Sequence, residues 1–268
     1  MTTRYKLGKK PARPGAAKLR LSTYLPKDTI KGIPPVFGYQ KDVAVWGMLG
    51  NDTVGDCAEA DAWHQTMLLN SEQIPPRLID VTDQTAIQTY SAVTGFDPSQ
   101  TDAAGNNPTD QGTDVLQLAE YRRTVGLTDA AGTVHRVGAY LALDQGNVSQ
   151  LRAAIYLFGG AVSIGVQLPD SAQTQFQNGD AWSPVAGAQI EGGHCITGVA
   201  GDNDGNIGVI TWGAFQWMTS AFYRRYNDES IVYLSTEFLT ASVSPEGFDL
   251  AQLTANMAEL PALADLGA

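Results

Sequence analysis

The spacing of apolar residues changes near the middle of this chain of 268 residues, and the change restricts the folds open to it. Helical spacing in the first half predicts helices over residues 57–72, 81–95, 113–126 and 147–160. Alternating or β-branched runs in the second half predict strands over residues 161–168, 194–201, 207–213 and 230–235. We expect a short helix over 219–226 and an amphipathic helix over 249–260. Helices followed by an antiparallel sheet predict an α+β fold.

Capping residues locate the ends of several predicted helices. Side chains that can accept a hydrogen bond from free backbone N–H groups stand at the start of three of them, at Asp56, Thr82 and Asn147. Glycines that permit a left-handed ending follow three of them, at Gly95, Gly126 and Gly159. Between two predicted strands, the sequence DNDGN at 202–206 indicates a hairpin turn; it lacks the terminal glutamate of an EF-hand calcium loop.

Charge divides the chain into a basic arm and an acidic body. Residues 1–41 hold ten Lys and Arg against one acid, Asp28, a net charge of +9. The remainder holds seven Arg, no Lys and 27 acids, a net charge of −20. Five prolines between residues 11 and 35 favour an extended backbone. We therefore expect three parts: an extended arm over 1–45, one domain over 46–245, and a helix with a tail over 246–268.

The arm carries apolar residues that a solubilising tail would not need, among them Leu19, Leu21, Tyr24, Leu25 and Phe37. Together with the opposite charges of arm and body, they predict docking on an acidic surface. We expect that surface to belong to another subunit or to a different acidic protein; docking on the chain's own body is the alternative. The basic arm also suits contact with nucleic acid, but the charge of −20 argues against a nucleic-acid groove on the body.

Composition excludes several other classes. Apolar residues make up 43% of the chain and charged residues 17%, which is typical of a globular protein. No apolar run reaches the roughly 18 residues that a membrane-spanning helix needs, so we expect no membrane partner. The basic start has no apolar segment behind it, and we do not expect a secretory signal. The glycine-rich stretches match neither a P-loop nor a dinucleotide fingerprint, so we expect no cofactor and no metal.

Few residues of this chain are suited to nucleophilic chemistry. Cys57 begins the predicted helix 57–72, where unpaired N–H groups lower the pKa of a thiol. Of the three histidines, His64 lies within that same helix, His135 has no motif around it, and His194 opens a strand after two glycines. The pattern favours Cys57 as a nucleophile with His194 as its base. A small buried side chain, a metal ligand or a disulfide partner remain the alternatives for Cys57.

Cys195 follows His194 directly. Neighbouring residues of a strand point to opposite faces. If His194 faces Cys57, Cys195 should therefore face away from it, into the core. This argues against a disulfide between Cys57 and Cys195 and against a zinc site built from these residues.

The sequences NDTVGDC, GGHCITGVAGDNDG and VITWG resemble the papain-like cysteine peptidase family. The matching positions, which lie in residues 45–70 and 190–214, are Asn51, Gly55, Cys57, His194, Trp212 and Gly213. The resemblance implies a papain-like fold and hydrolysis of a peptide or amide bond. It implies that Cys57 attacks the carbonyl, that His194 transfers the proton, and that Asn51 helps to hold the oxyanion.

Two positions depart from the family's pattern. Ala58 stands where the family usually has an aromatic residue after the cysteine. Ile210 stands where the family has the asparagine that orients the histidine. Thr211 is the nearest polar residue, and its hydroxyl is a candidate to accept a hydrogen bond from the imidazole.

The whole chain also resembles a group of phage and prophage proteins, through NDTVGDC, YLFGGAVSIGVQLPDSAQTQF, GGHC and VITWGAFQWMTSAFYRRYNDESIVYLS. This resemblance implies a location in the bacterial cytoplasm during infection or in the phage particle. It leaves three functions open: a thiol hydrolase acting on a peptide or amide substrate, a structural particle protein that keeps the fold, and a binding module with an inactive site.

Overall fold

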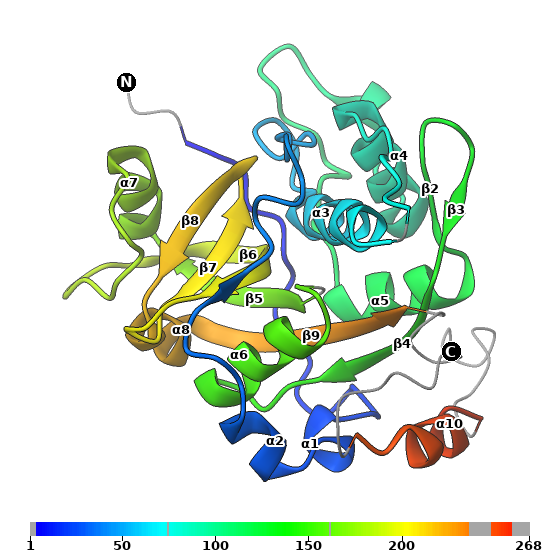
Figure 1. Ribbon diagram of the computed structural model, residues 1–268. Coiled ribbons are helices and arrows are strands. Elements are labelled where there is room, and N and C mark those ends of the chain that lie inside the picture. The colour runs from blue at the N-terminus through cyan, green and yellow to red at the C-terminus, as the bar shows by residue number, and fades with distance from the viewer. Residues whose placement is uncertain (1–3, 74, 161, 236–247, 259–268) are drawn as a thin grey trace.

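The central feature of the computed structural model is an antiparallel sheet, with strands in the order β4-β9-β5-β6-β7-β8 and a short strand β1 on β6 (Figure 1). The strands are β1 Phe37–Gly38, β4 Val137–Ala142, β5 Val162–Pro169, β6 Ile190–Gly201, β7 Ile207–Thr211, β8 Ala214–Met218 and β9 Asn227–Ser235. A separate pair, β2 Leu127–Thr128 and β3 Val134–His135, forms a small second sheet. The structure describes residues 4–73, 75–160, 162–235 and 248–258.

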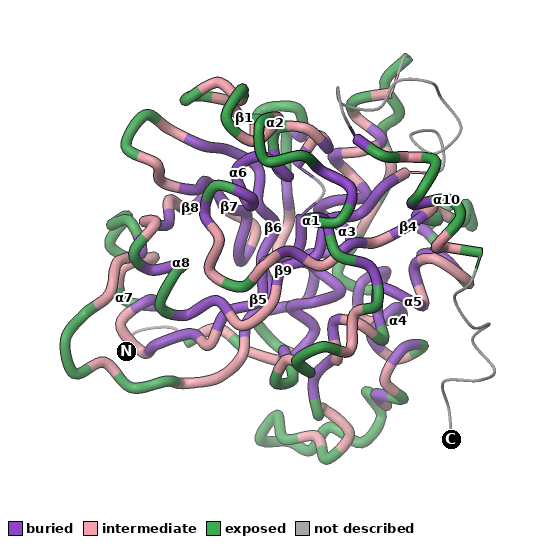
Figure 2. The backbone as a smooth tube through the Cα atoms, turned by 90° about the horizontal axis from the view of Figure 1, so that it is seen from below, coloured by how far each residue is buried: buried purple, intermediate pink, exposed green. Residues whose placement is uncertain are grey.

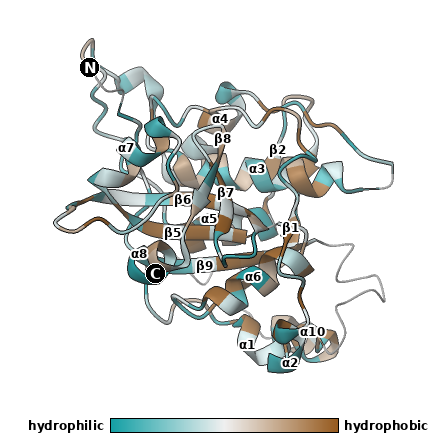
Figure 3. Ribbon diagram, turned by 60° about the vertical axis from the view of Figure 1, so that its left-hand side comes forward, coloured by the Kyte–Doolittle hydropathy of each residue, from teal (hydrophilic) through white to brown (hydrophobic). Residues whose placement is uncertain are grey.

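Helices cover both faces of this sheet. One face packs on the first helices of the domain, α3 Cys57–Ser71, α4 Asp83–Thr94 and α5 Val115–Thr124, with the 3-10 turn η1 Pro98–Gln100 after α4. The other face packs on α6 Val148–Leu157, α7 Asp170–Asn178 and α8 Ser220–Tyr226. The strands separate these cores by alternation: Ile231 and Tyr233 face the first group, whereas Val232 and Leu234 face the second. Figure 3 shows apolar colouring along β5 at the centre.

Helix α3 is the innermost helix. It is buried on nearly all sides, including its polar residues (Figure 2). Asp61 accepts hydrogen bonds from Ser163 on β5 and from Thr197 on β6, and Gln65 donates to Asp61 and to Ser163. Since buried polar groups are costly unless they are paired, this network holds α3 on the sheet in one position.

The arm is not extended throughout. Residues 4–20 lack helices, but α1 Leu21–Tyr24 and α2 Lys27–Lys31 follow, and then β1. Leu21 and Tyr24 are buried in the same core as α6 and β5, because the short helix α1 places both apolar side chains on one face. The C-terminal helix α10 Leu250–Ala258 packs on α1, where Asn256 donates to the hydroxyl of Tyr24.

The sequence predicted most of these elements. Thr82 caps α4 through a reciprocal hydrogen bond with Thr85, and Gly95 ends α4 in the left-handed conformation. Asp56 occupies the N-cap position of α3, but its side chain makes no capping bond. Helices α1, α2 and α7, the turn η1 and strands β1 to β4 and β8 were not predicted. The end of the helix expected over 249–260 lies outside the described residues. No helix within the described ranges is long and apolar enough to cross a membrane.

Candidate active site

Cys57 is the first residue of α3 and is 1% exposed. The loop before it turns through two left-handed residues, Leu49 and Gly50. The backbone N–H groups of Gly8 and Cys195 lie against the thiol and lower its pKa, but burial outweighs them and raises the pKa of Cys57 to about 12. The thiol is thus neutral in this structure, despite its place at a helix N-terminus.

His194 lies on β6 and is held from two directions. Its Nε2 is 2.8 Å from the hydroxyl of Thr211, at the end of β7. Its ring stacks on the indole of Trp212, with ring centres 4.7 Å apart and planes 21° apart. Nδ1 of His194 has no hydrogen-bond partner among the described residues. A threonine hydroxyl that accepts from Nε2–H leaves Nδ1 with a free lone pair.

The turn that carries Trp212 is strained. Thr211 pairs with Ala214, so Trp212 and Gly213 form a two-residue hairpin turn in which both residues have positive φ, 47° and 72°. This geometry normally favours Asn-Gly, and a bulky residue in it costs free energy. The strained turn brings the Trp212 ring onto His194. It also brings Gly213 against Gly47, where a Cβ would lie 2.9 Å from a carbonyl oxygen.

The first residues of the arm cross the site between the helices that carry Cys57, which we call the helical wall, and the strands that carry His194 and Thr211, which we call the sheet wall. Thr113 donates to the carbonyl of Gly8 at 2.7 Å and accepts from Lys10 at 2.9 Å, which ties the arm to the helical wall. Lys9 donates to the carbonyl of Gly193 at 3.0 Å, directly before His194 on the sheet wall. Tyr5 stacks on Trp212, with ring centres 4.8 Å apart. The arm therefore covers both Cys57 and His194.

Glycines make this close passage of the arm through the site possible. A Cβ on Gly8 would lie 1.7 Å from the carbonyl oxygen of Gly55. A Cβ on Gly112 would lie 2.0 Å from the carbonyl oxygen of Gly8, and one on Gly193 would lie 2.2 Å from that of Lys9. Any side chain at these positions would push the arm out, because such distances are far below van der Waals contact.

Burial governs the electrostatics of the site. It lowers the pKa of His194 to about 3, so the imidazole is neutral. Three acids lie near Cys57 on the helical side. Burial raises the pKa of Glu59 to about 8, although its hydrogen bonds from the Thr113 hydroxyl oppose the shift. It also raises the pKa of Asp56 and Asp61.

The other candidate residues occupy the following places. Asn51 is 2% exposed, and its side-chain amide lies 3.5 Å from the carbonyl of Lys6 and 3.4 Å from that of Val54. Ile210 packs in an apolar cluster with Trp46 and Leu68, away from the imidazole of His194. The family's asparagine position therefore has a packing role here, while the adjacent Thr211 reaches the histidine.

The two remaining histidines have structural partners. His64 contacts the carbonyls of Trp46 and Gly47, each at 3.1 Å. His135 pairs with Asp129 at 2.9 Å. Cys195 is buried in the core, as expected, but it does not face away from Cys57. It packs in the same apolar cluster as Cys57 and donates to Asp61, since its face of β6 is the one that α3 covers. Both cysteines are free thiols.

In this single chain the arm lies on its own body; packing on another subunit stays a prediction. Its charges find partners there: Arg4 pairs with Glu191, Arg13 with Asp114, and Arg20 with Asp144. Packing on another acidic protein stays a prediction. Lys9 was not among the residues predicted for the site; the signal available was the glycine before it, in the order Gly8-Lys9-Lys10. Among the described residues, no group of three or more His, Cys, Asp and Glu is arranged to hold a metal ion.

Comparison with known proteins places this geometry in a known fold. No family model matches the sequence, and no curated protein matches it. Solved structures do match. Xylellain, a cysteine protease from Xylella fastidiosa, is 14% identical with a TM-score of 0.62, over 88% of this chain and 99% of that one. A cysteine protease of Carica candamarcensis in complex with E-64 is 15% identical with a TM-score of 0.51, over 76% and 99%.

A procathepsin B from Trypanosoma congolense is 10% identical with a TM-score of 0.56, over 85% of this chain and 86% of that chain. At such identities the likeness concerns the fold. The helices on one side, the antiparallel sheet on the other, and the order of the elements agree with it. The chain therefore has the papain-like α+β fold.

Proposed function

We propose that this protein is a thiol hydrolase of peptide or amide bonds whose site is closed in this structure by its own arm. The observation that carries the proposal is the state of His194: Nε2 contacts Thr211, while Nδ1 is buried without a partner. Buried polar atoms are usually satisfied, and an imidazole nitrogen kept free is suited to accept a proton; we propose the thiol of Cys57 as its donor.

The proposed reaction has two halves. In the first, the Cys57 thiol passes its proton to Nδ1 of His194 as the sulfur bonds to the carbonyl carbon, and the backbone N–H of Cys57 with the Asn51 amide stabilises the oxyanion. The C–N bond then breaks, the amine leaves with the proton from His194, and a thioester remains. In the second half, water attacks the thioester with His194 as base, which releases the acid and the thiol.

The arm must leave before a substrate enters, because Gly8 occupies the space against Cys57. Departure would return water to the site and thereby bring the pKa of Cys57 down and that of His194 up, toward values at which proton transfer between them is easier. The match to a procathepsin B, a form named as a precursor, is consistent with a closed state on this fold.

A second candidate function is favoured by the same burial. A protein that keeps Cys57 and His194 at 1% exposure each is also consistent with a structural or assembly role without activity. The phage or prophage setting, in the cytoplasm of an infected bacterium or in the particle, remains part of this proposal and rests on sequence resemblance.

The test is peptide hydrolysis by the full-length chain carrying Gly8→Val, which displaces the arm without altering the body. We expect cleavage of an unstructured protein substrate by this variant, and loss of cleavage when Cys57→Ala or His194→Ala is added. Circular dichroism checks that each variant is folded. A folded Gly8→Val chain with an accessible Cys57 and no hydrolysis of a peptide library would favour the structural role instead.

A further inference from the structure

The arm places a fully buried lysine beside the site. The Lys9 side chain has no exposed surface, and its Nζ lies 2.8 Å from Asp228 and 2.9 Å from Glu229. Nζ also donates to the carbonyl of Lys10 at 2.9 Å. Burial alone lowers the pKa of Lys9, but the charges of Glu229 and Asp228 raise it above its usual value, so the ammonium is charged. Two carboxylates thus bind one basic side chain.

A bulge in β9 makes this arrangement possible. Gly165 pairs with Glu229, but the next residue, Val166, pairs with Asn227, which leaves Asp228 as the extra residue. Consecutive residues of a regular strand point to opposite faces, and a bulge is the device that turns both toward one side. Asp228 and Glu229 therefore share one pocket, although they are neighbours in sequence.

The floor of this pocket is Gly165. A Cβ there would lie 2.2 Å from Cε of Lys9 and 2.9 Å from Cγ of Glu229, so any other residue would close the pocket. Gln167 donates to Asp228 at 2.6 Å and fixes that carboxylate, whose second oxygen has no hydrogen-bond partner among the described residues. We call Gly165, Asp228 and Glu229 the acidic pocket.

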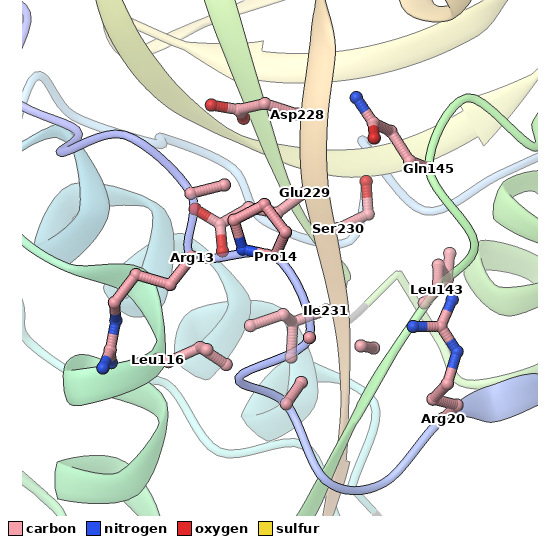
Figure 4. A pocket seen from close by; sticks show the side chains of 14 residues that line it. Arg13, Pro14, Arg20, Leu116, Leu143, Gln145, Asp228, Glu229, Ser230 and Ile231 are labelled. Atoms are coloured by element: carbon pink, nitrogen blue, oxygen red, sulfur yellow. The ribbon is translucent and has the colours of Figure 1, made fainter.

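Space continues beyond the two acids. A cavity of about 200 Å³ is lined by Asp228 and Glu229 and by Arg13, Pro14 and Arg20 of the arm. Figure 4 shows these side chains. Residues 12–20 of the arm form one wall of this cavity.

The residue that fills the acidic pocket is the neighbour, along the arm, of the residue that contacts Cys57. The residue that fills it, Lys9, donates its backbone N–H to Gly193, which precedes His194. The preceding residue, Gly8, has its N–H against the Cys57 thiol. A peptide whose backbone follows the same path would therefore present a side chain to Asp228 and Glu229 while an adjacent residue lies at Cys57.

We propose that the acidic pocket is a specificity pocket for lysine or arginine side chains of the substrate, and that Lys9 occupies it in the closed state as an internal mimic. This inference rests on the proposed function and adds the substrate class to it. The physical reason is charge: when the arm leaves, two adjacent carboxylates remain in a partly buried pocket, and a substrate cation restores their pairing. An apolar side chain would leave them unpaired.

The experiment uses the full-length chain with Gly8→Val and Lys9→Ala, so that the arm is displaced and the pocket empty. Fluorogenic peptides differ at one position only: lysine, arginine, norleucine or glutamate. We expect kcat/KM for lysine and arginine to exceed that for norleucine by about tenfold or more, as charge-assisted pairing requires, with glutamate lowest. Asp228→Asn with Glu229→Gln should bring the lysine preference to about twofold or less.

Asp144→Asn is the matched control, because Asp144 contacts the arm through Arg20 and not through Lys9. It should leave the lysine preference unchanged. If the doubly neutralised chain does not fold, the peptide series on the unchanged pocket decides alone. Equal kcat/KM for lysine and norleucine peptides would overturn the inference and show that Lys9 only fastens the arm.

A binding measurement separates this inference from the proposed function. Cys57→Ala is added to the Gly8→Val, Lys9→Ala chain, and binding of labelled peptides of arm residues 4–12 is followed by fluorescence anisotropy. A peptide with Lys9 should bind about tenfold more tightly than one with norleucine there. Selective binding without hydrolysis by the Cys57-containing chain would refute the hydrolase and keep the pocket. Hydrolysis together with equal binding of the two peptides would keep the hydrolase and refute the specificity pocket.

Discussion

The two parts of the N-terminal arm are held to the body by different forces. Residues 4–10 are held mainly by backbone hydrogen bonds, close glycine contacts and the ion pairs of Lys9, with Tyr5 and Leu7 only partly buried against the large core. Residues 19–25 contribute Leu19, Leu21, Tyr24 and Leu25 to the large core, each at 7% exposure or less.

This difference indicates which part of the arm can undock from the folded body. Apolar burial in a shared core is lost only when that core opens, so residues 19–25 belong to the cooperative fold. Hydrogen bonds and ion pairs exchange for water at modest net cost, so residues 4–10 are able to undock while the body stays folded. The boundary between the parts lies near Pro11 and Pro14, where no helix or sheet element is present.

We expect the largest effect on the free energy of unfolding from a substitution in residues 19–25, the second part of the arm. Leu21→Ala removes a fully buried side chain and should lower the free energy of unfolding by about 3 kcal/mol. Leu7→Ala, in the first part, should lower it by less than about 1 kcal/mol, because Leu7 is only partly buried against the core. Urea denaturation followed by circular dichroism measures both. Equal losses would mean that the whole arm is one structural unit.

Gly8→Val tests the first part directly. The added Cβ would meet the carbonyl oxygen of Gly55, so the arm should undock, and we expect alkylation of Cys57 by iodoacetamide to accelerate by about a hundredfold. Cys195 stays beneath α3 and should label slowly in both chains, which provides the internal control. Mass spectrometry after brief treatment distinguishes the two cysteines. Labelling of both at the same rate would indicate general unfolding rather than undocking.

The helical wall of the site predicts a pH effect. Burial raises the pKa of Glu59 to about 8 from 4.5, so the folded chain binds a proton that the unfolded chain releases. This contribution to stability is complete below pH 4.5 and is lost as the pH rises through 8. Glu59→Gln keeps an acceptor for Thr113 without the charge. Relative to the unsubstituted chain, it should gain on the order of 3 kcal/mol between pH 5 and pH 8.

Urea titrations at these two pH values measure the change. Asp83→Asn is the control, because Asp83 is an exposed acid in the first turn of α4. A Glu59→Gln chain whose stability follows the unsubstituted chain at both pH values would show that Glu59 ionises in the folded state at ordinary pH.

The sheet wall predicts the smallest effect. Thr211→Ala removes the partner of Nε2 of His194, and we expect hydrolysis by the Gly8→Val chain to fall about tenfold, with rescue by Thr211→Ser. His194→Ala should cost far more, because it removes the base itself. The stack on Trp212 continues to hold the ring in the Thr211 variant. Comparable losses from Thr211→Ala and His194→Ala would show that Thr211 is indispensable for orientation.

Local signals predicted the elements that build the site. Thr82 and Gly95 bound α4, and the glycine-containing turn at 202–206 joins β6 and β7. These features depend on residues within a few positions of each other, which a sequence displays directly. Strand β4 was missed because Gly138 and two alanines weaken its alternation. The motifs around Cys57 and His194 also predicted the papain-like fold.

Only the tertiary structure decided how these parts meet. Charge predicted that the arm docks on an acidic surface, but the choice of its own body depends on glycines from four segments that meet in space. Alternation along β6 predicted that Cys195 faces away from Cys57, whereas α3 covers that face of the sheet. The shared pocket of Asp228 and Glu229 depends on one bulge in β9, a matter of register with β5. Such contacts join residues far apart in the chain, and no local pattern encodes the distance between them.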